Sequence, residues 1–194
     1  MIKYFKRHGV LLTFLCVLFL ISIFIGILLY VKSSNDSKIY ISDLLTNIKE
    51  DLLNTKANNI FSHLLILVII SIFSFTALGY FSGIIYLFFE GISIGYTICA
   101  LTANYALKGL LFGFLYNIIF KFIFIIIYII FLLKLFDLIK LIVNYFIFKR
   151  SYTIKNNLKR IIFSIIILIL IILINDIIIY FLTNFLLKLI INVL

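Results

Sequence analysis

Ionisable side chains inside long apolar stretches are the residues of this chain that are best placed to do chemistry. They are Glu90, Lys121 and Asp176. Because a charge is costly in lipid, such residues usually face the interior of a helix bundle or a water-filled path. At about 1.5 Å per residue, Lys121 and Asp176 lie at similar expected depths, and Glu90 lies nearer the inner surface, within reach of Lys134. The sequence predicts a structural Lys121–Asp176 ion pair, with an ion or proton path as the alternative. The other polar residues predicted within the membrane are Asn117 and Asn175.

The sequence contains a match to the nucleophile motif of hydrolases, but the other residues that this motif requires are missing. Residues 91–95, GISIG, match G-x-S-x-G, but that motif requires a strand, a sharp turn and a helix, followed by an acid and a histidine. The two histidines, His8 and His63, both precede the serine. Neither histidine has a second ligand at metal spacing, and no H-E-x-x-H or C-x-x-C occurs. The sequence therefore indicates no enzyme, no metal and no cofactor.

Glycines at helical spacing mark where helices are expected to pack closely. Small residues four apart let two helix backbones approach each other in a membrane. The glycines predicted to act in this way are Gly79, Gly83, Gly91, Gly95, Gly109 and Gly113.

Composition places the chain in a membrane. It is 65% hydrophobic with a mean hydropathy of +1.32, against an apolar share of roughly 45–50% in soluble domains. The net charge of +10 comes from basic residues gathered at the ends of apolar segments, which fits the positive-inside rule better than nucleic-acid binding. Cys16 and Cys99 both lie in predicted spans and are expected to act as small apolar residues.

The pattern predicts one all-α, polytopic membrane domain over residues 1–194, with about five transmembrane helices and amphipathic interfacial helices. The expected spans are residues 9–30, 60–78, 84–103, 110–133 and 161–182, each long enough or nearly so to cross a bilayer. Short connections are expected at Gly79–Gly83 and Asn104–Lys108. Basic residues place the N-terminus and residues 134–160 in the cytoplasm. Within that basic segment, 134–148 is expected to be an interfacial helix. Because residues 110–148 contain no proline, the alternatives are one long bent helix or two short spans over that stretch.

The stretch 32–59 is the long polar segment expected outside the cell membrane. Its apolar residues recur at helical spacing and predict an amphipathic helix with Ser42 as its N-cap. This helix either lies on the lipid surface or docks an extracytoplasmic partner. The residues expected to form the docking face are Leu44, Leu45, Ile48 and Leu52.

Two stretches of the core, Leu87–Thr97 (LFFEGISIGYT) and Lys108–Phe114 (KGLLFGF), resemble the stage II sporulation protein M family. The order of parts over about residues 1–150 is similar as well. Many relatives carry a motif of the type Pro-His-Gly-x-x-Glu-x-Pro in the fourth span, and the matching positions here lack its prolines, histidine and glutamate. Those positions are Leu115, Tyr116, Asn117, Phe120 and Phe122.

The resemblance implies a non-enzymatic scaffold in the cell membrane, at the sporulation septum and engulfing membrane. It would recruit the sporulation cell-wall hydrolase proteins D and P, in contact with membrane lipid and either alone or as a homo-oligomer. The alternative is a small transporter or ABC-type permease subunit that uses Glu90, Lys121 and Asp176 along a path.

Overall fold

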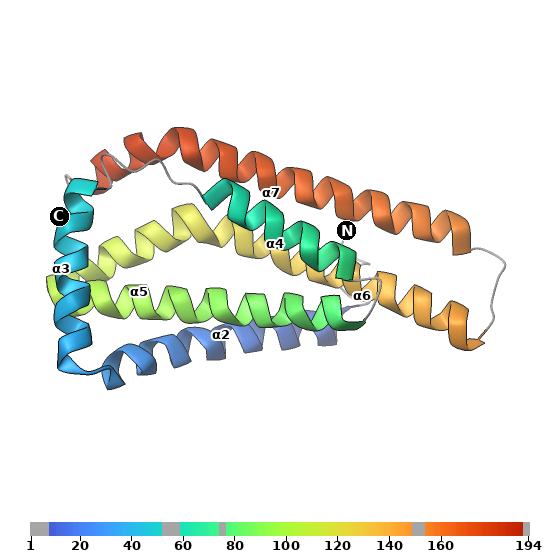
Figure 1. Ribbon diagram of the computed structural model, residues 1–194, viewed down its shortest axis with the longest axis horizontal. Coiled ribbons are helices and arrows are strands. Elements are labelled where there is room, and N and C mark those ends of the chain that lie inside the picture. Colours follow the sequence, from blue (N-terminus) through green and yellow to red (C-terminus); the bar gives the residue numbers. More distant parts are fainter. Residues whose placement is uncertain (1–7, 52–58, 74–76, 149–153, 192–194) are drawn as a thin grey trace.

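Helices make up every element of the computed structural model, which describes residues 8–51, 59–73, 77–148 and 154–191 (Figure 1). Within these ranges there is no strand. The elements are α2 (Gly9–Lys32), α3 (Asn35–Asp51), α4 (Asn59–Phe73), α5 (Ala77–Asn117), the π-helix η1 (Ile118–Phe122), α6 (Ile123–Phe148) and α7 (Ile154–Ile191).

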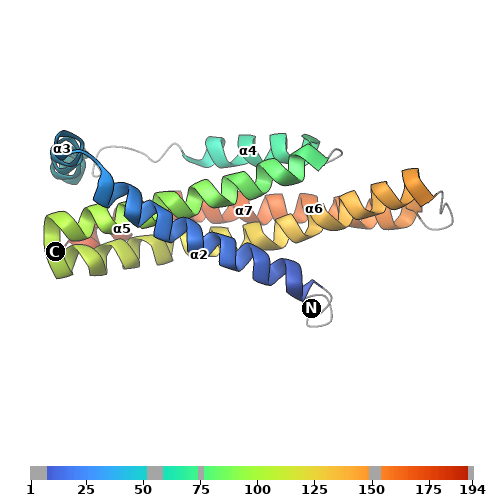
Figure 2. The same ribbon diagram turned by 90° about the horizontal axis from the view of Figure 1, so that it is seen from below.

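The chain runs back and forth along one bundle, and α3 lies across one end of it (Figures 1 and 2). The reversal between the third and fourth passes lies inside α5, at Ala106, whose φ of 51° and ψ of −130° are not helical. The first leg of α5, residues 77–105, and the second leg, residues 107–117, therefore form a hairpin. The reversal falls within Asn104–Lys108, where the sequence predicts a connection. A positive φ is strained for alanine, so the hairpin must be held by its packing.

The expected turn at Gly79–Gly83 is wrong, because both glycines lie inside α5. A glycine within a helix costs about 1 kcal/mol relative to alanine, which tertiary packing can offset. At Gly83 that packing is visible. The Tyr128 hydroxyl donates a 2.9 Å hydrogen bond to the Gly83 carbonyl, and a Cβ at Gly83 would lie 2.6 Å from Leu132 Cδ2.

Residues 134–148 are not a separate interfacial helix either. They continue α6 without a break to Phe148, and Leu133 and Leu135 are fully buried. No proline or glycine interrupts residues 123–148, and α7 packs along α6. Lys134 and Lys140, which predicted the end of a transmembrane span, therefore lie within α6, whose opposite face is buried in the core.

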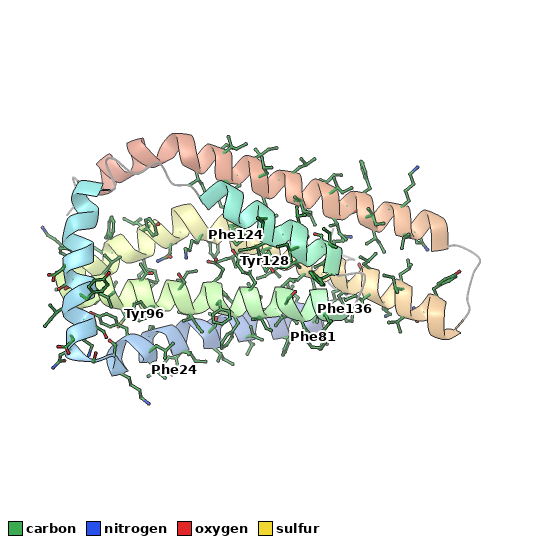
Figure 3. All side chains as sticks on the ribbon, viewed as in Figure 1. Phe24, Phe81, Tyr96, Phe124, Tyr128 and Phe136 are labelled. Atoms are coloured by element: carbon green, nitrogen blue, oxygen red, sulfur yellow. The ribbon has the colours of Figure 1, made fainter. Side chains whose placement is uncertain are left out.

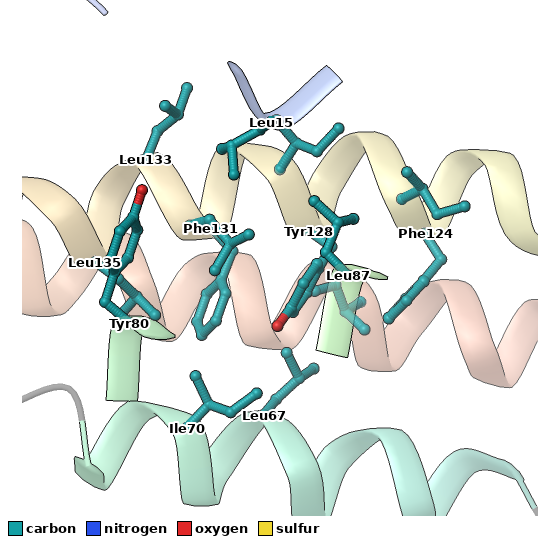
Figure 4. Packing of buried hydrophobic residues seen from close by; sticks show 14 of the residues in the cluster. Leu15, Leu67, Ile70, Tyr80, Leu87, Phe124, Tyr128, Phe131, Leu133 and Leu135 are labelled. Carbon is teal, nitrogen blue, oxygen red and sulfur yellow. The ribbon is translucent and has the colours of Figure 1, made fainter. Parts of the chain in front are cut away.

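The core is a layer of leucine, isoleucine and aromatic side chains contributed by every pass (Figure 4). Tyr128 and Phe131 are its largest fully buried side chains. Leu15 from α2, Leu67 from α4 and Leu87 from α5 close around them. In a bilayer, where lipid tails are as apolar as these side chains, such a layer stabilises the bundle by close van der Waals packing rather than by transfer out of water.

Large apolar side chains also cover the outside of the bundle. Phe24 and Phe81 are about 60% exposed and lie on the surface, whereas Phe124 and Tyr128 lie between helices (Figure 3). Among the described residues, three helices are long and apolar enough to cross a membrane: Gly9–Lys32, Leu78–Asn117 and Asn157–Ile179. An apolar exterior on helices of this length is compatible with an integral membrane protein.

Candidate functional site

An ion pair joins the first leg of α5 to η1, the π-helix that continues the second leg. Lys121 Nζ lies 3.3 Å from Glu90 Oε2 and donates a 3.1 Å hydrogen bond to Ser93 Oγ. The exposed fractions of the Lys121 and Glu90 side chains are 27% and 15%. Ser93, the serine of GISIG, thus lies within a helix and not at the strand–turn–helix junction that G-x-S-x-G requires.

The predicted Lys121–Asp176 ion pair is wrong, because Lys121 pairs with Glu90 instead. The depth argument assumed that the fourth span ends near Leu133, but the helix continues to Phe148. In an antiparallel hairpin, residues equally far from the reversal lie at the same level. Glu90 and Lys121 are almost equally far from Ala106, so the hairpin brings them together.

A π-helical turn carries Lys121. η1 follows the second leg of α5 directly, and its wider winding shifts the direction of each later side chain. At its start, Asn117 is buried and its Nδ2 donates a 2.7 Å hydrogen bond to the Gly113 carbonyl. The Asn117 Oδ1 is buried without a hydrogen-bond partner. Isolated π-turns are frequent at functional positions, and this one aims a cation at Glu90.

α7 adds a second acid to the same level of the bundle. Asp176 is buried, with 8% of its surface exposed. The Tyr86 hydroxyl is within electrostatic range of both Glu90 and Asp176. The neighbouring Asn175 has a buried Nδ2 with no hydrogen-bond partner. We call Tyr86, Glu90, Ser93, Lys121 and Asp176 the central polar cluster.

The central polar cluster lies near the middle of the bundle. Gly91, next to Glu90, packs against Ser22, which is close to the midpoint of α2. If α2 crosses the bilayer, the cluster is therefore far from both lipid surfaces. Charges at that depth are stabilised by pairing and by hydrogen bonds rather than by water.

Two glycines of the first leg of α5, Gly91 and Gly95, pack against α2. A Cβ at Gly95 would overlap the Ile23 carbonyl, and one at Gly91 would overlap the Ser22 hydroxyl. On the opposing side, a Cβ at Gly26 would overlap the Ile92 carbonyl. This surface is closed by contacts within the chain, so it is not available to a partner. We call this contact, formed by Ser22 and Gly26 of α2 with Gly91 and Gly95 of α5, the close seam. Its α2 half was not predicted from the sequence, although Ser22 and Gly26 are also small residues four apart.

Gly109 and Gly113, in the second leg of α5, pack against the first leg. A Cβ at Gly109 would overlap the Leu101 carbonyl, whereas one at Gly113 would lie 3.3 Å from the Ile98 Cα. The hairpin therefore depends more on Gly109 than on Gly113. Gly79 is buried within the first turn of α5.

α3 is joined to the end of α2 by polar contacts. The Ser34 Oγ accepts a 3.3 Å hydrogen bond from the Ser37 backbone N–H, so Ser34 caps the helix. The expected cap, Ser42, instead lies inside α3, and its hydroxyl donates to the Ile39 carbonyl at 2.7 Å. Lys38 Nζ donates a 2.9 Å hydrogen bond to the Val31 carbonyl. The helix began earlier than predicted because the serine that precedes Asn35 can satisfy its first N–H groups.

The expected docking residues are placed only in part. Leu44, Leu45 and Ile48 lie within α3, but their side chains are outside the described part of the structure, as is all of Leu52. Two other apolar side chains of α3 are exposed: Ile39 at 59% and Tyr40 at 65%. α3 thus presents apolar surface at the end of the bundle.

Comparison with known proteins yields no relative. No protein-family model matches the chain, and neither a curated protein nor a solved structure is significantly similar to it. The resemblance of Leu87–Phe114 to the stage II sporulation protein M family therefore stays a prediction.

Proposed function

We propose that this protein is an integral membrane scaffold that uses α3 to hold extracytoplasmic partners beside the membrane. The observation that carries the proposal is the position of α3. This helix is capped by Ser34, tied to α2 by Lys38, and laid across the end of an otherwise apolar bundle (Figure 2). A helix held in that way offers a preformed surface, which lowers the ordering cost of binding.

The scaffold would cross the membrane five times. Three passes, α2, the first leg of α5 and α7, run in one direction along the bundle. α4 and the helix from the second leg of α5 into α6 run in the opposite direction. Alternating passes put the beginning of α2 and the beginning of α7 at one end. The sequence before and around these two positions is strongly basic, which favours a cytoplasmic location for that end. α3 would then be outside.

The partners would be enzymes of the cell wall. This part of the proposal is supported by the sequence resemblance to the sporulation protein M family, whose role implies recruitment of hydrolase proteins D and P at the septum during engulfment. A scaffold acts by position. A hydrolase held at the membrane has a raised effective concentration on the nearby wall and needs no new catalytic contact.

The central polar cluster favours a second candidate, a transporter or permease subunit. Glu90, Lys121 and Asp176 lie on three different passes near the middle of the bundle, and ionisable residues at such positions often mark an ion or proton path. In that case the main partner would be a transport subunit, such as an ATPase, and α3 would contribute little to its capture.

Affinity purification distinguishes the two functions. The tagged protein would be isolated in mild detergent from membranes of engulfing cells, and co-purified proteins identified by mass spectrometry. We expect wall hydrolases with the wild type, and an at least tenfold loss with Leu44→Asp/Leu45→Asp, because two carboxylates would disrupt the apolar face of α3.

The matched control is Thr46→Asp, which adds a carboxylate at a position that the apolar repeat of the sequence leaves polar, and it should retain the partners. Each variant must reach the membrane in the same amount. Recovery of an ATPase without wall enzymes would replace the scaffold by the permease. Undiminished capture by the Leu44→Asp/Leu45→Asp variant would remove α3 as the docking surface.

A further inference from the structure

A cleft of about 460 Å³ lies where the beginning of α2 meets α6, away from the central polar cluster. The contact between the two helices is made by His8, whose Nε2 lies 3.2 Å from Asp137 Oδ1 and whose ring meets Phe136 edge-on. The residues that line the cleft are His8, Val10, Leu11, Phe14, Phe136 and Lys140. None of them contributes to the function proposed above.

The walls of this cleft are apolar and open to the outside of the bundle. The exposed fraction is 90% for Val10 and 51% for Phe14, and Phe136 forms the opposite wall. Val10 and Phe14 lie one turn apart on the same face of α2, and they follow Gly9, the first residue of an apolar helix. In a membrane, these walls would face the acyl chains rather than water.

The rim of the cleft carries positive charge. Lys140 is exposed, and among the described residues it forms no ion pair. Asp137 offsets the charge that His8 would carry when protonated, so the Lys140 ammonium remains uncompensated. Lys3, Lys6 and Arg7 precede His8 in the sequence and add to the positive charge near this end of α2.

We propose that this cleft binds one anionic phospholipid. The headgroup phosphate is held by the Lys140 ammonium at the membrane surface, and an acyl chain lies against Val10, Phe14 and Phe136. Basic pockets between transmembrane helices on the cytoplasmic side are known to suit anionic headgroups, and each cation near the surface contributes about 1 kcal/mol. The apolar walls of the cleft favour a lipid over a free phosphate, because an acyl chain would cover these walls and a phosphate ion would not.

The absence of tryptophan from the chain makes this proposal directly measurable. In Phe14→Trp the single indole lies at the wall of the cleft, and its fluorescence reports the neighbouring lipid. The protein would be reconstituted in vesicles that contain equal fractions of phosphatidylglycerol and phosphatidylcholine, with either one brominated on its acyl chains. We expect brominated phosphatidylglycerol to quench roughly fivefold more effectively, as one cation at the surface predicts.

Two variants serve as controls. Phe24→Trp places the indole on the same helix, outside the cleft and equally exposed to lipid, and should show no preference between the two lipids. Lys140→Gln, introduced into Phe14→Trp, removes an exposed charge without touching the core and should abolish the preference. Equal quenching by both lipids at Phe14→Trp, or a preference that survives Lys140→Gln, would overturn the proposal.

Discussion

Alanine at Gly95 is expected to break the contact between α2 and α5. The added Cβ would overlap the Ile23 carbonyl oxygen, with the carbonyl carbon at 2.8 Å and the Ile23 Cα at 3.1 Å. These are backbone atoms and cannot rotate away, so the two helices must separate. Overpacking of this kind destabilises by about 1–3 kcal/mol, and we expect the upper end of that range. Circular dichroism during a titration with sodium dodecyl sulfate would measure the loss.

The glycines themselves provide a graded control. Gly26→Ala meets the Ile92 backbone and should resemble Gly95→Ala. Gly9→Ala meets nothing within 4 Å, and Gly113→Ala meets contacts of 3.3–3.5 Å, of which the closest, to the Ile98 Cα, is tighter than usual. Because alanine favours a helix by up to about 1 kcal/mol over glycine, neither change should destabilise the fold by more than about 0.5 kcal/mol. If Gly95→Ala were as stable as Gly9→Ala, the close seam between α2 and α5 would be contradicted.

Replacement of Lys121 by methionine is the second change with a large expected effect. It would leave the Glu90 carboxylate without its cation in the middle of the bundle. Removal of one partner from a buried pair costs about 3–5 kcal/mol. The pair is only 27% and 15% exposed, and in a bilayer lipid rather than water would surround that exposed fraction. We expect a loss of roughly 3 kcal/mol in the same titration.

A double-mutant cycle identifies the partner of Lys121. Glu90→Gln combined with Lys121→Met should be more stable than the sum of the single losses predicts, by about 1–3 kcal/mol, because the two groups are in contact. The matched cycle with Asp176→Asn should show a smaller coupling. A larger coupling to Asp176 than to Glu90 would restore the pair that sequence depth alone suggested.

Hydropathy was enough to predict that the described residues are helical and that some helices are long and apolar enough to cross a membrane, because long apolar runs without proline leave few other structures. The place of the reversal near Ala106 was also close to the predicted connection. There the signal was a short polar interruption, Asn104 to Lys108, between two apolar segments.

Boundaries inside the apolar runs could not be read in the same way. The glycines at Gly79 and Gly83 were taken for a turn, although a helix tolerates glycine where a neighbour packs against it. Lys134 was taken for a membrane edge, although α6 continues beyond it and buries Leu135. The first error moved the expected depth of Glu90 and the second moved that of Lys121, and together they led to the wrong partner.

The closure of the glycine surface by α2 is the other feature that the sequence did not reveal. Gly91 and Gly95 indicated close packing correctly in kind, but their spacing says nothing about which helix approaches. Only the three-dimensional arrangement places Ser22 and Gly26 opposite them. Contacts between segments that are far apart in sequence depend on topology, and no local pattern encodes them.

The orientation of the bundle decides whether α3 can meet a partner outside the cell membrane. In a background with Cys16→Ala and Cys99→Ala, single cysteines would be introduced as Ser37→Cys in α3, Asn104→Cys beside the reversal and Asn157→Cys at the start of α7. These three positions are exposed. Labelling with a membrane-impermeant maleimide would be compared between intact and lysed cells.

Five passes with the basic end inside predict that Ser37→Cys and Asn104→Cys are labelled in intact cells, and that Asn157→Cys is labelled only after lysis. Labelling of Asn157→Cys in intact cells, or protection of Ser37→Cys until lysis, would contradict an outward-facing α3 and the scaffold that depends on it.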